Sequence, residues 1–262
     1  MRPLVLAIGG SDSSGGAGIA ADIRAAHDLG ADLRLALTAV TVQSERSVRS
    51  VLPVPPDILA EQVATALLDK HVGAVKIGML GTAEAVAAVA DALAGTLVPV
   101  VLDPVLAATS GGRLLDADGL ALLLLRLLPR ATLLTPNLPE LAILGAALGF
   151  DVSAAGQEDI AAGLLSAGAG AVLVKGGHAE GAVARDRLFR PSDGAERAAV
   201  HHAVACAAFE APRLAVSMRG TGCTLATAIA VELARGAGLP DACRTAKAYL
   251  EERLVAAART AS

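Results

Sequence analysis

Apolar runs of strand length alternate with amphipathic runs of helix length through most of this chain, and this alternation most strongly constrains its fold. LVLAIGG (4–10) and VPVVLDPV (98–105) have the length of buried strands, and runs such as 17–30 have the period of a helix. Parallel strands are joined by crossover helices, so a repeated strand–helix unit predicts a mostly parallel sheet with helices on both faces. The expected strands are 4–10, 33–43, 74–80, 98–105, 132–137 and 171–177, separated by expected helices at 17–30, 56–71, 84–95, 118–128, 139–149 and 159–169.

The last third of the chain departs from this alternation. From about 179 to 216 the sequence breaks into short pieces around PSDG and EAPR, which predicts hairpins or a ribbon at the sheet edge. Two helices, 220–236 and 240–258, then close the chain. Because no linker, repeat or low-complexity tail interrupts the sequence, we expect a single α/β domain over 1–262.

Composition favours a small-molecule partner. The net charge is -4, no Lys/Arg cluster occurs, and there is one Tyr and no Trp, whereas a nucleic-acid surface needs a basic stripe or stacking aromatics. The start of the chain predicts a strand rather than a signal peptide. The apolar run 119–129 is too short to cross a bilayer and contains Arg126, so no membrane association is expected. Three cysteines without close spacing fit reduced thiols, and we expect a cytoplasmic protein.

Polar and glycine-rich segments follow several of the expected strands. SDSSGG (11–16), TPN (135–137) and KGGH (175–178) come directly after strands, and parallel sheets bind ligands at the carboxyl ends of their strands. The glycines of 9–18 would let backbone N–H groups approach an oxygen-rich ligand, or would form only a capped turn. No Lys completes a Walker A loop there, and the spacing does not fit a dinucleotide fingerprint.

TPNLPE (135–140) places an amide and a carboxylate at the start of an expected helix. Asn137 and Glu140, with Asp103 of LDPV at the same edge, could orient a hydrated Mg²⁺ ion on substrate phosphates. The alternative is structural, with Asn137 as the helix N-cap and Glu140 completing a capping box.

GTGC (220–223) precedes a long apolar helix and predicts an anion site. Glycine-supported N–H groups at a helix N-terminus carry a partial positive charge. Cys223 would lie in the first turn, where the helix dipole lowers a thiol pKa toward neutrality and makes the thiol a base or nucleophile. The alternative is a small buried cysteine at a helix start.

Taken in order, GSDSSGGAGIxAD, VQ, KIGML, LDPV, TSG, TPNLPE, VKGGH and GTGCTL resemble the hydroxymethylpyrimidine kinase/phosphomethylpyrimidine kinase family of thiamine biosynthesis. The resemblance runs from about Leu4 to the last helix and implies a ribokinase-like fold. It implies phosphorylation of 4-amino-5-hydroxymethyl-2-methylpyrimidine and then of its monophosphate, with ATP and Mg²⁺. It also implies a homodimer or larger assembly.

The resemblance assigns roles to individual residues. In the acceptor pocket it implies Gln43, Asp22, Met79 and Val105. It implies that the nucleotide is bound by Asn137, Glu140, Lys175 and Arg219. It also implies that Glu140 and Asp103 bind the metal ion. For the chemistry it implies Cys223 as the base, with Gly220, Thr221 and Gly222 cradling the transferring phosphoryl group.

The chain departs from the family pattern at Ala20, at Ser44–Ser47 and at Arg219, where the family usually has Gln, Asn-Thr-Arg-Gly-like residues and His. An Arg fork suits phosphate and stays charged, so we hypothesise that Arg219 contacts a phosphate of ATP or of the acceptor. The alternative is that Arg219 is simply solvated.

Two other functions fit the same residues. One is a pyridoxine or pyridoxal kinase on the same scaffold, although the Gln43 amide favours an aminopyrimidine because it can donate and accept at once. The other is a pyrimidine- or nucleotide-binding protein without turnover, because a fold alone does not establish activity.

Overall fold

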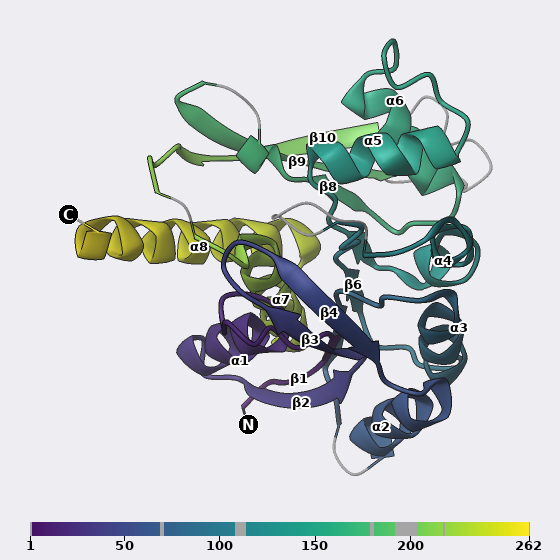
Figure 1. Cartoon of the computed structure of the whole chain (residues 1–262). Coiled ribbons are helices and arrows are strands. Elements are labelled where there is room, and N and C mark those ends of the chain that lie inside the picture. The colour runs from purple at the N-terminus through teal and green to yellow at the C-terminus, as the bar shows by residue number, and fades with distance from the viewer. Residues whose placement is uncertain are drawn as a thin grey trace.

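An eight-stranded, mostly parallel sheet forms the centre of the molecule (Figure 1). The computed structural model describes residues 2–68, 71–107, 114–178, 181–191, 204–216 and 218–261. Strand order is β10-β9-β8-β7-β6-β5-β1-β2, with β9 and β10 antiparallel to their neighbours. The strands are β1 (Leu4–Gly9), β2 (Asp32–Leu37), β5 (Ala74–Ile77), β6 (Val100–Leu102), β7 (Leu133–Leu134), β8 (Val172–Val174), β9 (Val183–Pro191) and β10 (Val204–Pro212).

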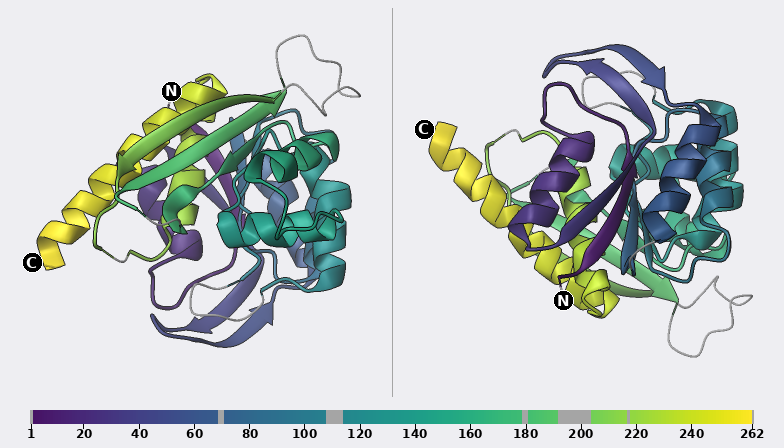
Figure 2. Two further views of the ribbon diagram at one scale, coloured as in Figure 1. Left: turned by 90° about the horizontal axis from the view of Figure 1, so that it is seen from above. Right: turned by 90° about the horizontal axis from the view of Figure 1, so that it is seen from below.

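Helices cover both faces of this sheet, which confirms the predicted α/β architecture (Figure 2). One face packs against α1 (Gly18–Asp28), α7 (Thr221–Ala234) and α8 (Leu239–Ala261). The other packs against α2 (Pro56–Leu68), α3 (Ala83–Ala92), α4 (Ala117–Leu122), α5 (Leu138–Ala147) and α6 (Gln157–Ser166). No helix among the described residues combines the length and apolarity needed to span a bilayer.

The predicted strand 33–43 is two strands that belong to different sheets. β2 ends at Leu37, and the chain turns at Thr38 into β3 (Ala39–Gln43), which pairs antiparallel with β4 (Val48–Pro53) in a separate ribbon (Figure 2). The Thr38 hydroxyl donates to the carbonyl of Met79 at 2.7 Å, and this buried contact fixes the turn. Both strands have strand-like patterns, so periodicity alone could not separate them, and β4 was not predicted.

The predicted helix 118–128 changes its winding part of the way along. α4 is followed by a π-helical segment over Leu123–Leu127 and a 3-10 turn over Leu128–Arg130. Pro129 has no N–H to donate, so a regular α-helix cannot continue through it.

The irregular segment 179–216 contains the edge ribbon that its sequence suggested. β9 and β10 pair antiparallel from Val183 opposite Pro212 to Pro191 opposite Val204. Residues 192–203, together with 108–113, which include the TSG motif, lie outside the described residues. The two closing helices are present as expected.

Candidate active site

A cavity of about 460 Å³ opens at the carboxyl ends of the parallel strands, beside the N-terminus of α7. Loops after β1, β5, β6, β7 and β8 reach it, because parallel strands with crossover helices place these loops on one edge. All but one of the predicted site residues line it: Gln43, Met79, Asp103, Val105, Asn137, Glu140, Lys175, Arg219, Gly220, Thr221, Gly222 and Cys223.

Two glycines allow close backbone contacts at this cavity, Gly220 between the start of α7 and the segment before α1, and Gly18 between the start of α1 and the loop after β1. Gly220 has a φ of 71°, and a Cβ there would lie 2.5 Å from the carbonyl oxygen of Gly16. Gly18 has a φ of 55°, and its Cβ would lie 2.3 Å from the carbonyl oxygen of Gly10. Only glycine fits both the backbone angle and the close approach. The first N–H groups of α7 have no partner within the helix and are placed to bind an anion.

Cys223 lies half-buried in the first turn of α7 and lines the cavity. Burial raises the pKa of its thiol to about 11, with Lys76 acting to lower it and Asp22 and Asp103 acting to raise it. The prediction of a thiol pKa near neutrality was therefore wrong, because desolvation of the thiolate outweighs the helix dipole. At neutral pH the thiol form of Cys223 therefore predominates over the thiolate.

Asp103, Lys175 and Glu140 form one charged cluster on the adjoining wall. The Lys175 ammonium Nζ lies 2.6 Å from Asp103 Oδ1 and 3.9 Å from Glu140 Oε2. Although burial opposes its charge, the two carboxylates raise the pKa of Lys175 above its ordinary value. Burial, helped by the charge of Asp103 and opposed by Lys175, raises the pKa of Glu140 to about 7.

Asn137 and Glu140 form the capping box that was the structural alternative for TPNLPE. The Asn137 Oδ1 accepts from the N–H of Glu140 at 2.9 Å, and Glu140 Oε2 accepts from the N–H of Asn137 at 2.8 Å. The box fixes both side chains at the cavity. A ligand-binding role is compatible with it, since a carboxylate has further lone pairs.

Arg219 bridges three segments at the cavity rim and is not simply solvated. Its Nη2 lies 3.3 Å from Asp12 Oδ2, and its Nη1 donates to the carbonyl of Ser44 at 3.1 Å and to the hydroxyl of Ser14. Asp12 in turn accepts from the N–H of Ala17 at 2.8 Å. Arg219 thus ties the start of α7 to the loop after β1 and to the turn between β3 and β4.

The structure does not place Asp22 on the cavity wall. Asp22 is fully buried, where its carboxylate oxygens lie 2.9 and 3.0 Å from Nζ of Lys76. Burial raises the pKa of Asp22, although Lys76 and Thr227 oppose this rise. Sequence reasoning passed over Lys76 within KIGML. The lone charge in a run of otherwise apolar strand residues was the signal that could have found it.

A second buried ion pair, also missed from the sequence, lines another part of the cavity. Asp186 accepts from Lys247 at 2.8 Å and from the N–H of Gly176 at 2.9 Å. Arg213 donates to the carbonyls of Gly177 and Val183, so the strap after β10 is tied to the loop after β8. These contacts fix the part of the cavity wall that Gly177, Asp186, Arg213 and Lys247 form.

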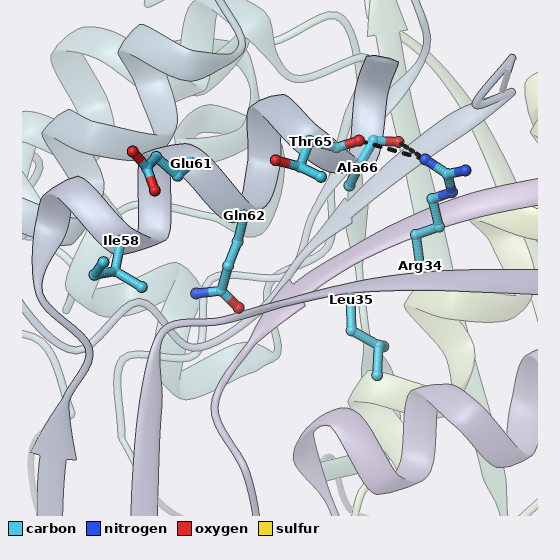
Figure 3. Close-up of a pocket in the computed structure, with 7 residues that line it drawn as sticks. All are labelled: Arg34, Leu35, Ile58, Glu61, Gln62, Thr65 and Ala66. Carbon is cyan, nitrogen blue, oxygen red and sulfur yellow. Dashed lines mark hydrogen bonds between the residues drawn. The ribbon is translucent and has the colours of Figure 1, made fainter. Parts of the chain in front are cut away.

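A second hollow lies away from these groups, where the edge strand β2 meets α2 (Figure 3). Arg34 donates there to the carbonyl of Ala66 at 2.8 Å, and Gln62 bonds both to the N–H and to the carbonyl of Leu37. Gln62 satisfies backbone groups at the open edge of β2, and Arg34 ties that edge to the end of α2. We assign this hollow to edge protection.

The fold and the cavity define a small-molecule kinase of the ribokinase-like class: a mostly parallel sheet, an anion-binding helix start and a neighbouring carboxylate–lysine cluster. The family model of phosphomethylpyrimidine kinase matches residues 12–261. The chain belongs to the phosphomethylpyrimidine kinase family. Kinases of this class use ATP.

Named relatives and solved structures agree with this family. The hydroxymethylpyrimidine/phosphomethylpyrimidine kinase of Rhizobium meliloti is 41% identical over 99% of this chain and 93% of its own length. The crystal structure of phosphomethylpyrimidine kinase from Clostridium difficile is 30% identical, has a TM-score of 0.78, and covers 96% of this chain and 99% of its own. The pyridoxal kinase of Staphylococcus aureus, solved with pyridoxal, has a TM-score of 0.80 at 28% identity and covers 97% of this chain and 88% of its own.

Proposed function

We propose that this chain transfers the γ-phosphoryl group of ATP to 4-amino-5-hydroxymethyl-2-methylpyrimidine and then to the resulting monophosphate, as the kinase of thiamine biosynthesis. The observation that carries this proposal is one continuous cavity that joins Gln43 to the Lys175–Glu140 wall across the start of α7. Such a cavity brings an acceptor and a nucleotide together at one anion-binding helix end.

The acceptor half of the cavity is built around Gln43. Its backbone is fixed by Ser13, whose hydroxyl accepts from the N–H of Gln43 and donates to its carbonyl, both at 2.8 Å. The side-chain amide can then pair with a ring nitrogen and the adjacent amino group of an aminopyrimidine. Met79 and Val105 supply apolar surface for a flat ring. Asp22 is buried behind the wall, where it binds Lys76.

The nucleotide half uses Asn137, Glu140, Lys175 and Arg219. Glu140 and Asp103 would hold a hydrated Mg²⁺ ion, since this ion is usually bound through one or two carboxylates plus substrate phosphates. The donor set fits, because Glu140 is a buried carboxylate whose charge is poorly compensated, as its raised pKa shows. When bound, the ion would neutralise part of the negative charge on the ATP phosphates. The described residues contain no group of three or more His, Cys, Asp or Glu able to hold a metal alone.

The start of α7 and Lys175 have different roles in the transfer from that of Cys223. The N–H groups of Gly220, Thr221 and Gly222 stabilise charge on the transferring group, and Lys175 screens the phosphates. The thiolate form of Cys223, which is a small fraction at neutral pH, accepts the proton of the hydroxymethyl group as its oxygen bonds to phosphorus. In the second transfer the acceptor is already an anionic phosphate and needs no base.

A coupled ADP-release assay tests this proposal with three acceptors offered separately: the pyrimidine alcohol, its monophosphate and pyridoxal. We expect ADP release with both pyrimidines and a kcat/KM at least tenfold lower with pyridoxal. Pyridoxal is included because of the structural similarity to the Staphylococcus aureus enzyme. Preference for pyridoxal would replace the proposed acceptor, and no ADP with any acceptor would favour a binding protein.

We further propose that the enzyme works as a homodimer in the cytoplasm. The β3–β4 ribbon exposes Val40, Val42 and Leu52, whose exposed fractions are 49%, 55% and 67%. Exposed apolar side chains grouped on one element are typical of a protein interface. Sedimentation velocity of the purified chain and of Leu52→Glu tests the assembly. A monomer at micromolar concentration in the unsubstituted chain would contradict it.

A further inference from the structure

Lys76 is a charged residue at the centre of the sheet. It lies on β5 opposite Ala7 of β1 and Val101 of β6, and only 1% of it is exposed. Its neighbours Val75 and Ile77 point into the core on the opposite face. Placing an ammonium there costs several kcal/mol unless it is paired.

A buried carboxylate and hydroxyl hold this ammonium below the start of α7. Asp22 of α1 binds Nζ of Lys76 through both oxygens, and Thr227 of α7 donates to Asp22 at 2.7 Å. Thr227 lies one helical turn after Cys223, so the two residues share a face of α7. The Lys76 unit, defined as Lys76, Asp22 and Thr227, therefore meets α7 one helical turn after Cys223, and the charge of Lys76 acts on the Cys223 thiol.

The surroundings leave room for the ammonium to reach the cavity. Lys76 is buried and yet is one of the residues that line the cavity with Cys223. A Cβ at Gly78 would lie 2.8 Å from Nζ of Lys76, so the glycine directly after β5 keeps this space open. Stability alone does not explain the pair, since well-packed apolar residues usually replace a buried ion pair without loss.

We propose that Lys76 is a positioning residue that stabilises the thiolate of Cys223 and so makes it available as the base of the first transfer. The acceptor hydroxyl gives its proton to Sγ of the thiolate while its oxygen bonds to the γ-phosphorus. The bond from that phosphorus to the bridging oxygen of ATP breaks, and its electron pair leaves with ADP. Asp22 holds Lys76 in place and keeps it charged.

Four charged groups face Cys223 from the elements packed around it. Lys76 on β5 and Lys175 after β8 favour the thiolate, and Asp22 on α1 and Asp103 after β6 oppose it. Of these, Lys76 exerts the largest effect on the thiol after burial itself. Removing Lys76 and Asp22 together should therefore disfavour the thiolate on balance.

The test is the pH dependence of Cys223 alkylation by iodoacetamide, followed by mass spectrometry of the peptide that contains it. Lys76→Met alone leaves Asp22 unpaired and destabilises the fold, so the main variant is the double change Lys76→Met with Asp22→Asn. We expect alkylation of Cys223 in the double variant to be about tenfold slower at about pH 9, which corresponds to a shift of about one pH unit. A purely structural role would leave this pH profile unchanged.

The second buried pair provides a matched control. Lys247→Met with Asp186→Asn removes an ion pair of the same kind that lines the same cavity, and neither residue is among the main influences on the Cys223 thiol. Its alkylation profile should match that of the unsubstituted chain. An unchanged profile in the Lys76 double variant would overturn the proposal, as would an equal shift in the control.

The proposal rests on the base role proposed for Cys223, but the alkylation readout does not depend on it. ADP release from the two pyrimidine acceptors is measured on the same variants. A shifted thiol profile with a selective loss of the first transfer supports both proposals. A shifted profile with unchanged rates for both acceptors would remove the base role and leave the electrostatic link intact.

Discussion

The protonation state of Cys223 determines how the first transfer should depend on pH. Because the pKa of Cys223 is raised to about 11, the thiolate fraction increases about tenfold for each unit by which pH rises toward that value. We expect kcat/KM for the pyrimidine alcohol to rise between about pH 7 and about pH 10, while the value for the monophosphate rises much less. Steady-state kinetics with both acceptors measures this, and parallel profiles would contradict it.

Replacing Cys223 makes the same distinction without changing pH. Cys223→Ala removes the base, so the first phosphorylation should slow about 10²- to 10⁴-fold, the usual contribution of general base catalysis. The second should slow less than tenfold, because its acceptor is already ionised. Separate rates with each purified acceptor measure the ratio. Cys243→Ala, a change at a buried cysteine of α8 that does not line the cavity, is the matched control. Equal losses in both steps would refute the assignment.

The buried carboxylate of Glu140 should affect both the free energy of unfolding and the Mg²⁺-dependent activity. The pKa of Glu140 is about 7 in the folded protein and 4.5 when unperturbed. Between these two pH values the folded state binds a proton at Glu140 that the unfolded state has lost, so the free energy of unfolding falls as pH rises from 4.5 to about 7. Glu140→Gln keeps the capping box and removes the buried charge. We expect it to raise unfolding free energy by about 1–2 kcal/mol at about pH 8, with no gain near pH 4, and to weaken Mg²⁺-dependent activity. Thermal melts at both pH values and a Mg²⁺ titration test this. A destabilised variant at pH 8 would contradict it.

At the scale of elements, the start of α7 depends on Gly220. Gly220→Ala would combine a left-handed backbone with a contact to Gly16, so we expect at least about 2 kcal/mol of destabilisation and a large loss of kcat. Gly236, at the other end of the same helix, has a φ of 87° but open space around its Cα. Gly236→Ala should cost only about 1 kcal/mol and retain activity. Similar kinetics in the two variants would contradict this role for the α7 start.

Arg219 connects the start of α7 to the loop after β1 and to the turn between β3 and β4. Arg219→Ala releases the β3–β4 turn and the loop after β1, and removes a cation from the rim, so KM for the monophosphate should rise about tenfold or more. Arg46→Ala, an exposed change in the same turn, is the control. Unchanged KM values for ATP and for the monophosphate would show that Arg219 binds no phosphate.

At the scale of the whole molecule, the sequence predicted what depends on periodicity and motif order. The βα alternation predicted the layered sheet, and the motifs after the strands supplied site residues of which all but Asp22 line the cavity. The errors share a physical cause: they depend on contacts made across the fold. Thr38 ends a strand because Met79 meets it, and Asp22 is withdrawn from the wall because Lys76 binds it. Burial from several elements likewise sets the Cys223 pKa.

The position of α7 in the sequence determines when the active site can form during translation. This helix packs against α1, α8 and the central strands and is buried along residues 224–232, yet it is translated after every strand of the described sheet. The acceptor wall around Gln43 exists in the chain long before the phosphoryl-binding turn at Gly220 leaves the ribosome. A nascent chain therefore carries one half of the site and no activity, and a premature stop before α7 yields an unfilled core rather than a slower kinase.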